Sequence, residues 1–142
     1  MYTSPLPLIG WGATLAVFAL AWWKGGQPER YGASLKLATS LIALVVHIAL
    51  KQQTISIALL IADGVLALGF LLLAIRYASL WTGACMILQA GQFSLHAYYL
   101  VAELARDRLY AVTNNLVTLG ILVCILTGTL LAWRRRSGAQ AD

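Results

Sequence analysis

The sequence predicts an all-α membrane protein in which one domain, residues 1–142, forms a bundle of five transmembrane helices. Hydrophobic residues make up 61% of the chain and charged residues only 11%, which is too apolar for an ordinary soluble domain. Apolar segments long enough to cross a bilayer alternate with short polar ones. The expected spans are 6–23, 33–50, 55–75, 80–101 and 110–133.

The first segment has no basic residue before it and no cleavage site of small residues. We therefore expect a membrane anchor and not a cleaved signal peptide. A polar stretch follows, from Lys24 to Lys36, and Gly25, Gly26 and Pro28 predict that it is a loop. An alternative fold has four spans and leaves the first segment at the periphery of the bundle.

The next helices are joined by tight turns at 51–54 and 76–79, so they should be antiparallel neighbours. Between these turns, the segment 55–75 is interrupted only by Asp63. The fifth helix should end at the arginines of 134–136, and we expect the six residues after them to fray.

The basic residues lie at the ends of apolar segments, which is typical of topology signals and not of a nucleic-acid-binding surface. With the N-terminus outside, the cytoplasmic basic residues are Lys24, Arg30, Lys36, Arg76, Arg134, Arg135 and Arg136. The outer ones are Lys51, Arg106 and Arg108. This bias predicts a multi-pass protein of a bacterial inner membrane with its C-terminus in the cytoplasm.

Polar side chains follow one face of the fourth helix, in steps of three and four residues. They are Cys85, Gln89, Gln92, His96, Tyr99 and Glu103. Because hydrocarbon solvates such groups poorly, this face should look into protein or water. Neither cysteine suits a disulfide framework or a zinc motif, so Cys85 and Cys124 are interpreted as small packing residues.

The rise of an α-helix per residue gives the depth of each polar group below the outer end of its helix. His47 and His96 should lie about 6 Å below the outer end of their helices, and Asp63 and Gln92 about 12 Å below it. The sequence therefore predicts a polar funnel in the outer half of the bilayer above a drier inner half. The candidate ligand-binding residues are Asp63, Gln92, His96, His47, Gln89, Tyr99 and Asn114.

Each of these residues also has a structural explanation. Asn114 and its neighbour Asn115 could cap the fifth helix. Gln89 and Gln92 could form hydrogen bonds between helices. Asp63 could be protonated, bonded to Gln92, or paired with a histidine, because a bare carboxylate at that depth costs about 2.5–3.5 kcal/mol.

Several chemistries fit these residue types. Histidines 47 and 96 could be axial ligands of a haem, and a quinone could occupy a slot lined by Gln92, His96 and Tyr98 or Tyr99. A metal site is not expected, because Asp63 lies about one turn too deep to join the histidines. No nucleophile–base pair or phosphate loop is evident, which argues against an enzyme.

The spacing W-x7-Q-x6-H formed by Trp81, Gln89 and His96, together with QPERYGA at 27–33 and Asp63, resembles a group of small uncharacterised bacterial integral-membrane proteins. The resemblance covers most of the second to fourth helices. In that group the tryptophan is commonly followed by proline, whereas Thr82 stands here. The resemblance implies that Asp63, Gln89 and His96 act as a set, and it implies no activity.

These observations favour a protein that binds a small or amphiphilic ligand in the outer polar pocket. The rival hypothesis is a structural or accessory subunit whose polar stripe contacts another membrane protein or a second copy. A haem-binding protein with His47 and His96 as ligands is the third hypothesis.

Overall fold

The computed structural model describes residues 6–141, except for the side chains of residues 6, 7, 52 and 53. It contains five helices, and residues 6–141 include no strand. The helices are α1 (Leu6–Lys24), α2 (Gln27–Ala49), α3 (Gln52–Tyr77), α4 (Leu80–Val101) and α5 (Arg108–Ala141). The all-helical fold is thus as predicted, while residues 1–5 and 142 of the predicted domain lie outside the described part.

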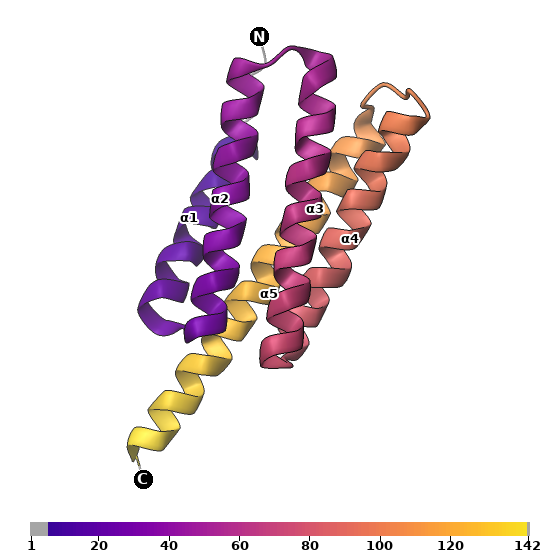
Figure 1. Cartoon of the computed structure of the whole chain (residues 1–142). Coiled ribbons are helices and arrows are strands. Elements are labelled where there is room, and N and C mark those ends of the chain that lie inside the picture. Colours follow the sequence, from indigo (N-terminus) through magenta and orange to yellow (C-terminus); the bar gives the residue numbers. More distant parts are fainter. Residues whose placement is uncertain (1–5, 142) are drawn as a thin grey trace.

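The helices run up and down in sequence order (Figure 1). The α2–α3 turn and the α4–α5 loop lie at one end, which we call the upper end; the other two turns and the C-terminus lie at the lower end. Helix α3 packs most extensively on α4, and α5 contacts α4, α1 and α2. Helices α2, α3 and α5 are long and apolar enough to cross a membrane, whereas the described apolar part of α1 is shorter.

Helix α2 begins earlier than predicted. The expected loop from Lys24 to Lys36 shrinks to Gly25 and Gly26, because Pro28 occupies the first turn of the helix. Proline suits this position, where its missing N–H needs no partner. One turn in, the Glu29 carboxylate accepts a hydrogen bond from the backbone N–H of Gly26 at 2.8 Å and so caps the helix.

Helix α5 is longer than predicted at its C-terminal end. It runs through the three arginines at 134–136 and continues to Ala141, with residues 133–141 exposed below the bundle. The prediction that the arginines end the helix was wrong. Arginine, alanine and glutamine are good helix formers, so a helix that leaves an apolar environment can continue into water.

The two predicted tight turns are present. Only Leu50 and Lys51 separate α2 from α3, and only Ala78 and Ser79 separate α3 from α4. Ala78 adopts a left-handed conformation with φ 47°, and its N–H donates to the carbonyl of Ala74. Such a C-cap ends α3 abruptly and allows α4 to turn back along it.

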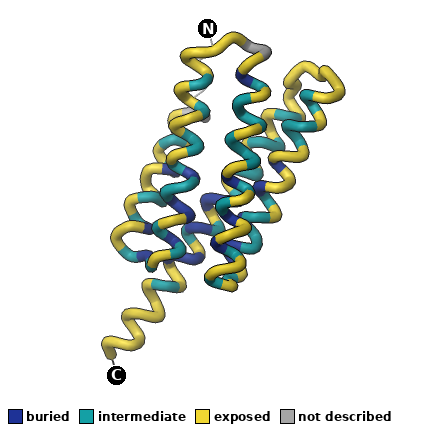
Figure 2. Tube along the Cα trace, viewed as in Figure 1, coloured by how far each residue is buried: buried dark blue, intermediate teal, exposed yellow. Residues whose placement is uncertain are grey.

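The apolar core lies in the lower half of the bundle, where buried residues gather (Figure 2). The indole of Trp81 packs against the backbone of both Gly32 in α2 and Gly128 in α5. Buried Phe70 and Ile121 surround it in the same cluster. A large ring between two glycines brings three helices close together, which closes the lower half.

Both predicted packing cysteines belong to this region. Cys85 is fully buried in the core, and its thiol lies 3.8 Å from the carbonyl oxygen of Ile121. Cys124 is partly buried against the same cluster, and both cysteines are free thiols. Their position agrees with the interpretation that they fill space between α4 and α5.

Candidate functional site

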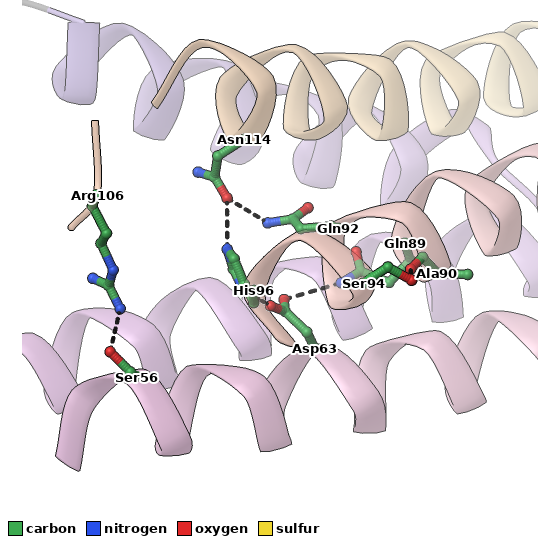
Figure 3. Close-up of polar contacts among 9 residues, drawn as sticks. All are labelled: Ser56, Asp63, Gln89, Ala90, Gln92, Ser94, His96, Arg106 and Asn114. Carbon is green, nitrogen blue, oxygen red and sulfur yellow. Dashed lines mark hydrogen bonds and ion pairs between the residues drawn. The ribbon is translucent and has the colours of Figure 1, made fainter. Parts of the chain in front are cut away.

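Above the core, Asp63 of α3 connects two side chains of α4 (Figure 3). One carboxylate oxygen pairs with Nδ1 of His96, and the other accepts a hydrogen bond from Nε2 of Gln89 at 3.0 Å. The side chains of Asp63 and His96 are only 14% and 8% exposed. From the sequence, either Gln92 or a histidine could be the partner of Asp63. In the structure its partners are His96 and Gln89.

Asn114 of α5 extends this network to a third helix. Its side-chain oxygen accepts a hydrogen bond from Nε2 of Gln92 at 2.8 Å and lies 3.2 Å from Nε2 of His96. Asn114 cannot cap α5, as one alternative proposed, because the helix begins at Arg108. We call Asp63, Gln89, Gln92, His96 and Asn114 the polar network.

The polar network constrains the protonation of His96. Both ring nitrogens face oxygen acceptors, one from Asp63 and one from Asn114. A neutral imidazole has only one N–H, so both contacts can be hydrogen bonds in this arrangement only with a doubly protonated ring. A neutral ring also fits if the side-chain amides of Asn114 and Gln92 are both flipped by about 180°. The Asn114 amide nitrogen then donates to His96.

A cavity of about 700 Å³ lies beside the polar network, in the upper half of the bundle. All five helices contribute to its wall. Four residues of the polar network line it: Asp63, Gln92, His96 and Asn114. Its apolar lining includes Leu44, Leu59, Leu66, Leu119 and Leu122. Its size and mixed lining are typical of small-molecule sites.

Lys36 also lines the cavity, which corrects its predicted role as a charge in the loop before α2. It lies inside α2 and is only 7% exposed. The sequence carried a signal for this position, because Lys36 shares a helix face with Ser40, Ala43 and His47.

His47 lines the cavity but stands apart from the polar network. The residue is exposed, and its Nδ1 lies 2.8 Å from the carbonyl oxygen of Ala43 in its own helix. Both nitrogens of His96 already face protein acceptors. In this arrangement His96 offers no free nitrogen to an iron atom. Within residues 6–141, no group of three or more His, Cys, Asp or Glu residues could hold a metal ion.

A second cluster of polar contacts closes the upper end. Asp107, in the loop before α5, accepts hydrogen bonds from the hydroxyl of Tyr99 at 2.9 Å and from the backbone N–H of Tyr110 at 2.8 Å. The Tyr110 N–H and then the Tyr99 hydroxyl hold the pKa of the Asp107 carboxyl below its usual value. Tyr99, a predicted site residue, thus helps to fasten this loop and belongs to neither the cavity wall nor the polar network.

Arg106 and Tyr110 are wall residues that sequence reasoning missed. The Tyr110 ring stacks on His96 with centroids 5.3 Å apart, and the Arg106 guanidinium lies 5.4 Å from the centre of the Tyr110 ring. Arg106 also donates to the hydroxyl of Ser56 at 2.9 Å, which ties the loop to α3 (Figure 3). The periodicity of α5 could have placed Tyr110 one turn before Asn114, but the path of the loop gave no signal in the sequence.

Comparisons of the chain with models of protein families, with curated proteins and with solved structures gave no match. The three residues of the W-x7-Q-x6-H spacing nevertheless all lie inside the bundle. Trp81 and Gln89 are buried, and the His96 side chain is nearly so. All three face the interior of the bundle, with Trp81 in the lower core and the other two on Asp63.

Proposed function

We propose that this chain is a multi-pass membrane protein that binds a small amphiphilic molecule in the upper cavity. The observation that carries the proposal is the cavity of about 700 Å³, whose wall combines residues of the polar network with leucines. An amphiphile satisfies both surfaces at once, because its polar group can replace water at the network while its chain covers the leucines.

The outer surface of the bundle supports a membrane location. Large apolar side chains are exposed on α3, including Leu68 at 61%, Leu72 at 67% and Ile75 at 71%. An apolar surface of this kind is unfavourable in water and favourable in lipid. With the charge bias of the sequence, we propose five spans in a bacterial inner membrane, with the upper end outside and the C-terminus in the cytoplasm.

The middle of the polar face of α4 already has partners within the chain. Gln89 is fully buried and Gln92 is only 6% exposed, and both donate hydrogen bonds to neighbouring helices of the same chain. The rival proposal of an accessory subunit would therefore need a different contact surface. The arrangement of His47 and His96 likewise gives no specific support to haem ligation.

Thermal unfolding in a nonionic detergent tests ligand binding. We expect at least one of palmitate, monopalmitoylglycerol and ubiquinone-2 to raise Tm by about 5–10 °C at a concentration of about 100 Kd. Ala43 lines the cavity, so Ala43→Trp should fill it and abolish the shift. Ala90 is exposed on α4, and Ala90→Trp serves as the matched control.

The proposal fails if none of these amphiphiles changes Tm. It also fails if Ala43→Trp and Ala90→Trp respond like the wild type, because binding would then occur outside the cavity. An absorbance spectrum of protein expressed with added haem tests the third hypothesis separately. Absence of a Soret band, or a band unchanged by His47→Ala and His96→Ala, excludes bis-histidine haem.

A further inference from the structure

Cationic side chains outnumber carboxylates around the cavity, and this excess bears on the charge of the ligand. The inference rests on the proposed function. Two cationic side chains, Lys36 and Arg106, line the cavity, against one carboxylate, Asp63. His96 and His47 are the other titratable side chains that line it, apart from Tyr110. The excess of positive charge favours an anion.

Asp63 is already committed within the polar network. One of its oxygens pairs with His96 and the other accepts from Gln89, so both have protein partners. If His96 is doubly protonated, the imidazolium balances the charge of Asp63. With a neutral His96, Asp63 balances Lys36 and Arg106 remains in excess. In either state, the cavity wall has at least one positive charge that no carboxylate of the wall balances.

Lys36 lies where a buried head group would meet it. It is only 7% exposed and occupies the lowest of the α2 positions that line the cavity, one turn below Ser40. A cation in such surroundings is stabilised by a paired anion. The amide nitrogen of Asn114 points away from Gln92 and His96 and so offers a second donor from a residue of the cavity wall (Figure 3).

The geometry points to an amphiphile with an anionic head group, a carboxylate or a phosphate, as the ligand, with Lys36 as its principal contact. Asn114 adds an amide donor to the cavity wall when its side-chain oxygen accepts from His96. The acyl chain lies along the leucines of α3 and α5, which are Leu59, Leu66, Leu119 and Leu122. Arg106, at the upper end, adds a long-range attraction that draws the anion into the cavity.

Native mass spectrometry from a nonionic micelle tests this by competition among amphiphiles that share a sixteen-carbon chain. The probes are palmitate, palmitoyl lysophosphatidic acid, monopalmitoylglycerol and hexadecyltrimethylammonium. We expect at least one anionic probe to bind about tenfold or more tightly than monopalmitoylglycerol, and the cationic probe to bind most weakly. The better of the two anionic probes distinguishes a free fatty acid from a phosphate head group.

Substitutions of lysine and arginine test which cationic side chain causes the preference for anionic probes. Lys36→Gln should remove most of the anionic preference, whereas Lys36→Arg should keep most of it. Lys51 is exposed at the α2–α3 turn, so Lys51→Gln is the matched control and should retain the wild-type preference. Arg106→Gln should lower the preference without abolishing it, and it provides a second reading if Lys36→Gln does not fold.

The outcomes separate this inference from the proposed function. If monopalmitoylglycerol binds as tightly as the anionic probes and Ala43→Trp blocks it, the cavity binds amphiphiles but the anionic assignment is overturned. An anionic preference that survives both Lys36→Gln and Arg106→Gln also overturns it. If no probe of any charge binds, both the inference and the proposed function fail.

Discussion

The structural role of Asp63 depends on its ion-pair and hydrogen-bond partners. A carboxylate within an apolar helix is costly to bury, and here His96 and Gln89 offset that cost with an ion pair and a hydrogen bond. The pair forms between helices α3 and α4, which pack most extensively. Asp63 therefore both stabilises the α3–α4 contact and shapes the cavity wall.

Substitutions of Asp63 test how much its contacts with His96 and Gln89 stabilise the fold. Asp63→Leu leaves His96 and Gln89 without an acceptor, and we expect a loss of about 3 kcal/mol, which lowers Tm by about 6–12 °C. Asp63→Asn keeps one acceptor and should lose about 1 kcal/mol. Thermal unfolding in detergent measures both, and Glu103→Gln, at an exposed position, is the control.

The same variants test the role of Asp63 in binding. The amount of each variant in the membrane fraction should match the wild type, because leucine favours insertion. Asp63→Leu should alter the thermal shift given by palmitate more strongly than Asp63→Asn does. Equal ligand responses in the wild type and Asp63→Leu would contradict a role in the cavity wall.

Asp107 predicts an acid-sensitive loop at the upper end. Its pKa in the folded protein is lowered from 3.8 by the Tyr110 N–H and the Tyr99 hydroxyl, so the charged form is favoured on folding. A lowered pKa gives a stabilisation that is fully present above the usual value and is lost as pH falls through the folded one. Hydrogen exchange in the first turn of α5, corrected for intrinsic rates, should therefore stay constant down to about pH 5 and rise below pH 3.8.

The variant Asp107→Asn isolates this effect. Asparagine can still accept the Tyr110 N–H, but it does not titrate, so the rise in exchange below pH 3.8 should disappear. Glu103→Gln, in the same loop, should keep the wild-type profile. An acid-dependent rise that persists in Asp107→Asn would show that another group controls the loop.

At the scale of the element, α4 has two functions along one face. Its lower part contributes Trp81, Thr82 and Cys85 to the packed core, and its upper part contributes Gln92 and His96 to the cavity wall. Gln89 lies between them, fully buried against Asp63. The change from packed to open therefore occurs within a single helix, at about the level of Gln89.

The lower core depends on the absence of a side chain at Gly128. A Cβ there would lie 2.6 Å from Nε1 of Trp81, so Gly128→Ala should push the ring away and destabilise the fold by about 1–3 kcal/mol. Gly138 lies on the same helix, where a Cβ would meet open space. Gly138→Ala is thus the matched control and should be neutral or stabilising by about 0.5–1 kcal/mol.

Thermal unfolding of both alanine variants in detergent measures this difference. Combination of Gly128→Ala with Trp81→Leu should cost less than the sum of the single changes, because the smaller side chain makes room for the new methyl group. Equal Tm values for the Gly128 and Gly138 variants would show that the indole does not hold α4 against α5.

The helix ends illustrate where sequence patterns mislead. Gly25, Gly26 and Pro28 predicted a loop up to Lys36, yet Pro28 and Glu29 are signals that begin a helix. At the other end, Arg134, Arg135 and Arg136 marked the end of the apolar run and not the end of the helix. Hydropathy predicts where lipid would end, whereas backbone hydrogen bonds and caps decide where a helix ends.

On the scale of the whole molecule, the core and the main cavity lie at different levels of the bundle. The Trp81 cluster packs the lower half, and the cavity occupies the upper half between all five helices. The α4–α5 loop, fastened by Arg106 and Asp107, lies at the upper end of this site.

Cysteine labelling tests the proposed orientation of the whole bundle. In a Cys85→Ala, Cys124→Ala background, Lys51→Cys should react with a membrane-impermeant maleimide in intact spheroplasts, and Ser137→Cys only after permeabilisation. Leu8→Cys should also react from outside if α1 spans the membrane, and only after permeabilisation if four helices span it. The reverse pattern for Lys51→Cys and Ser137→Cys would contradict the orientation.

The sequence by itself determined the helical class, the order of the helices, the tight turns and the polar face of α4, because all four depend on local periodicity and turn chemistry. It also placed Asp63 and His96 among the candidates. Only the tertiary structure decided that Asp63 pairs with His96 and Gln89, that Gln92 pairs with Asn114, and that Lys36 faces the cavity. Periodicity specifies the face on which a residue lies, but its partner depends on how neighbouring helices rotate and slide, and close packing such as that of Trp81 against Gly128 sets this.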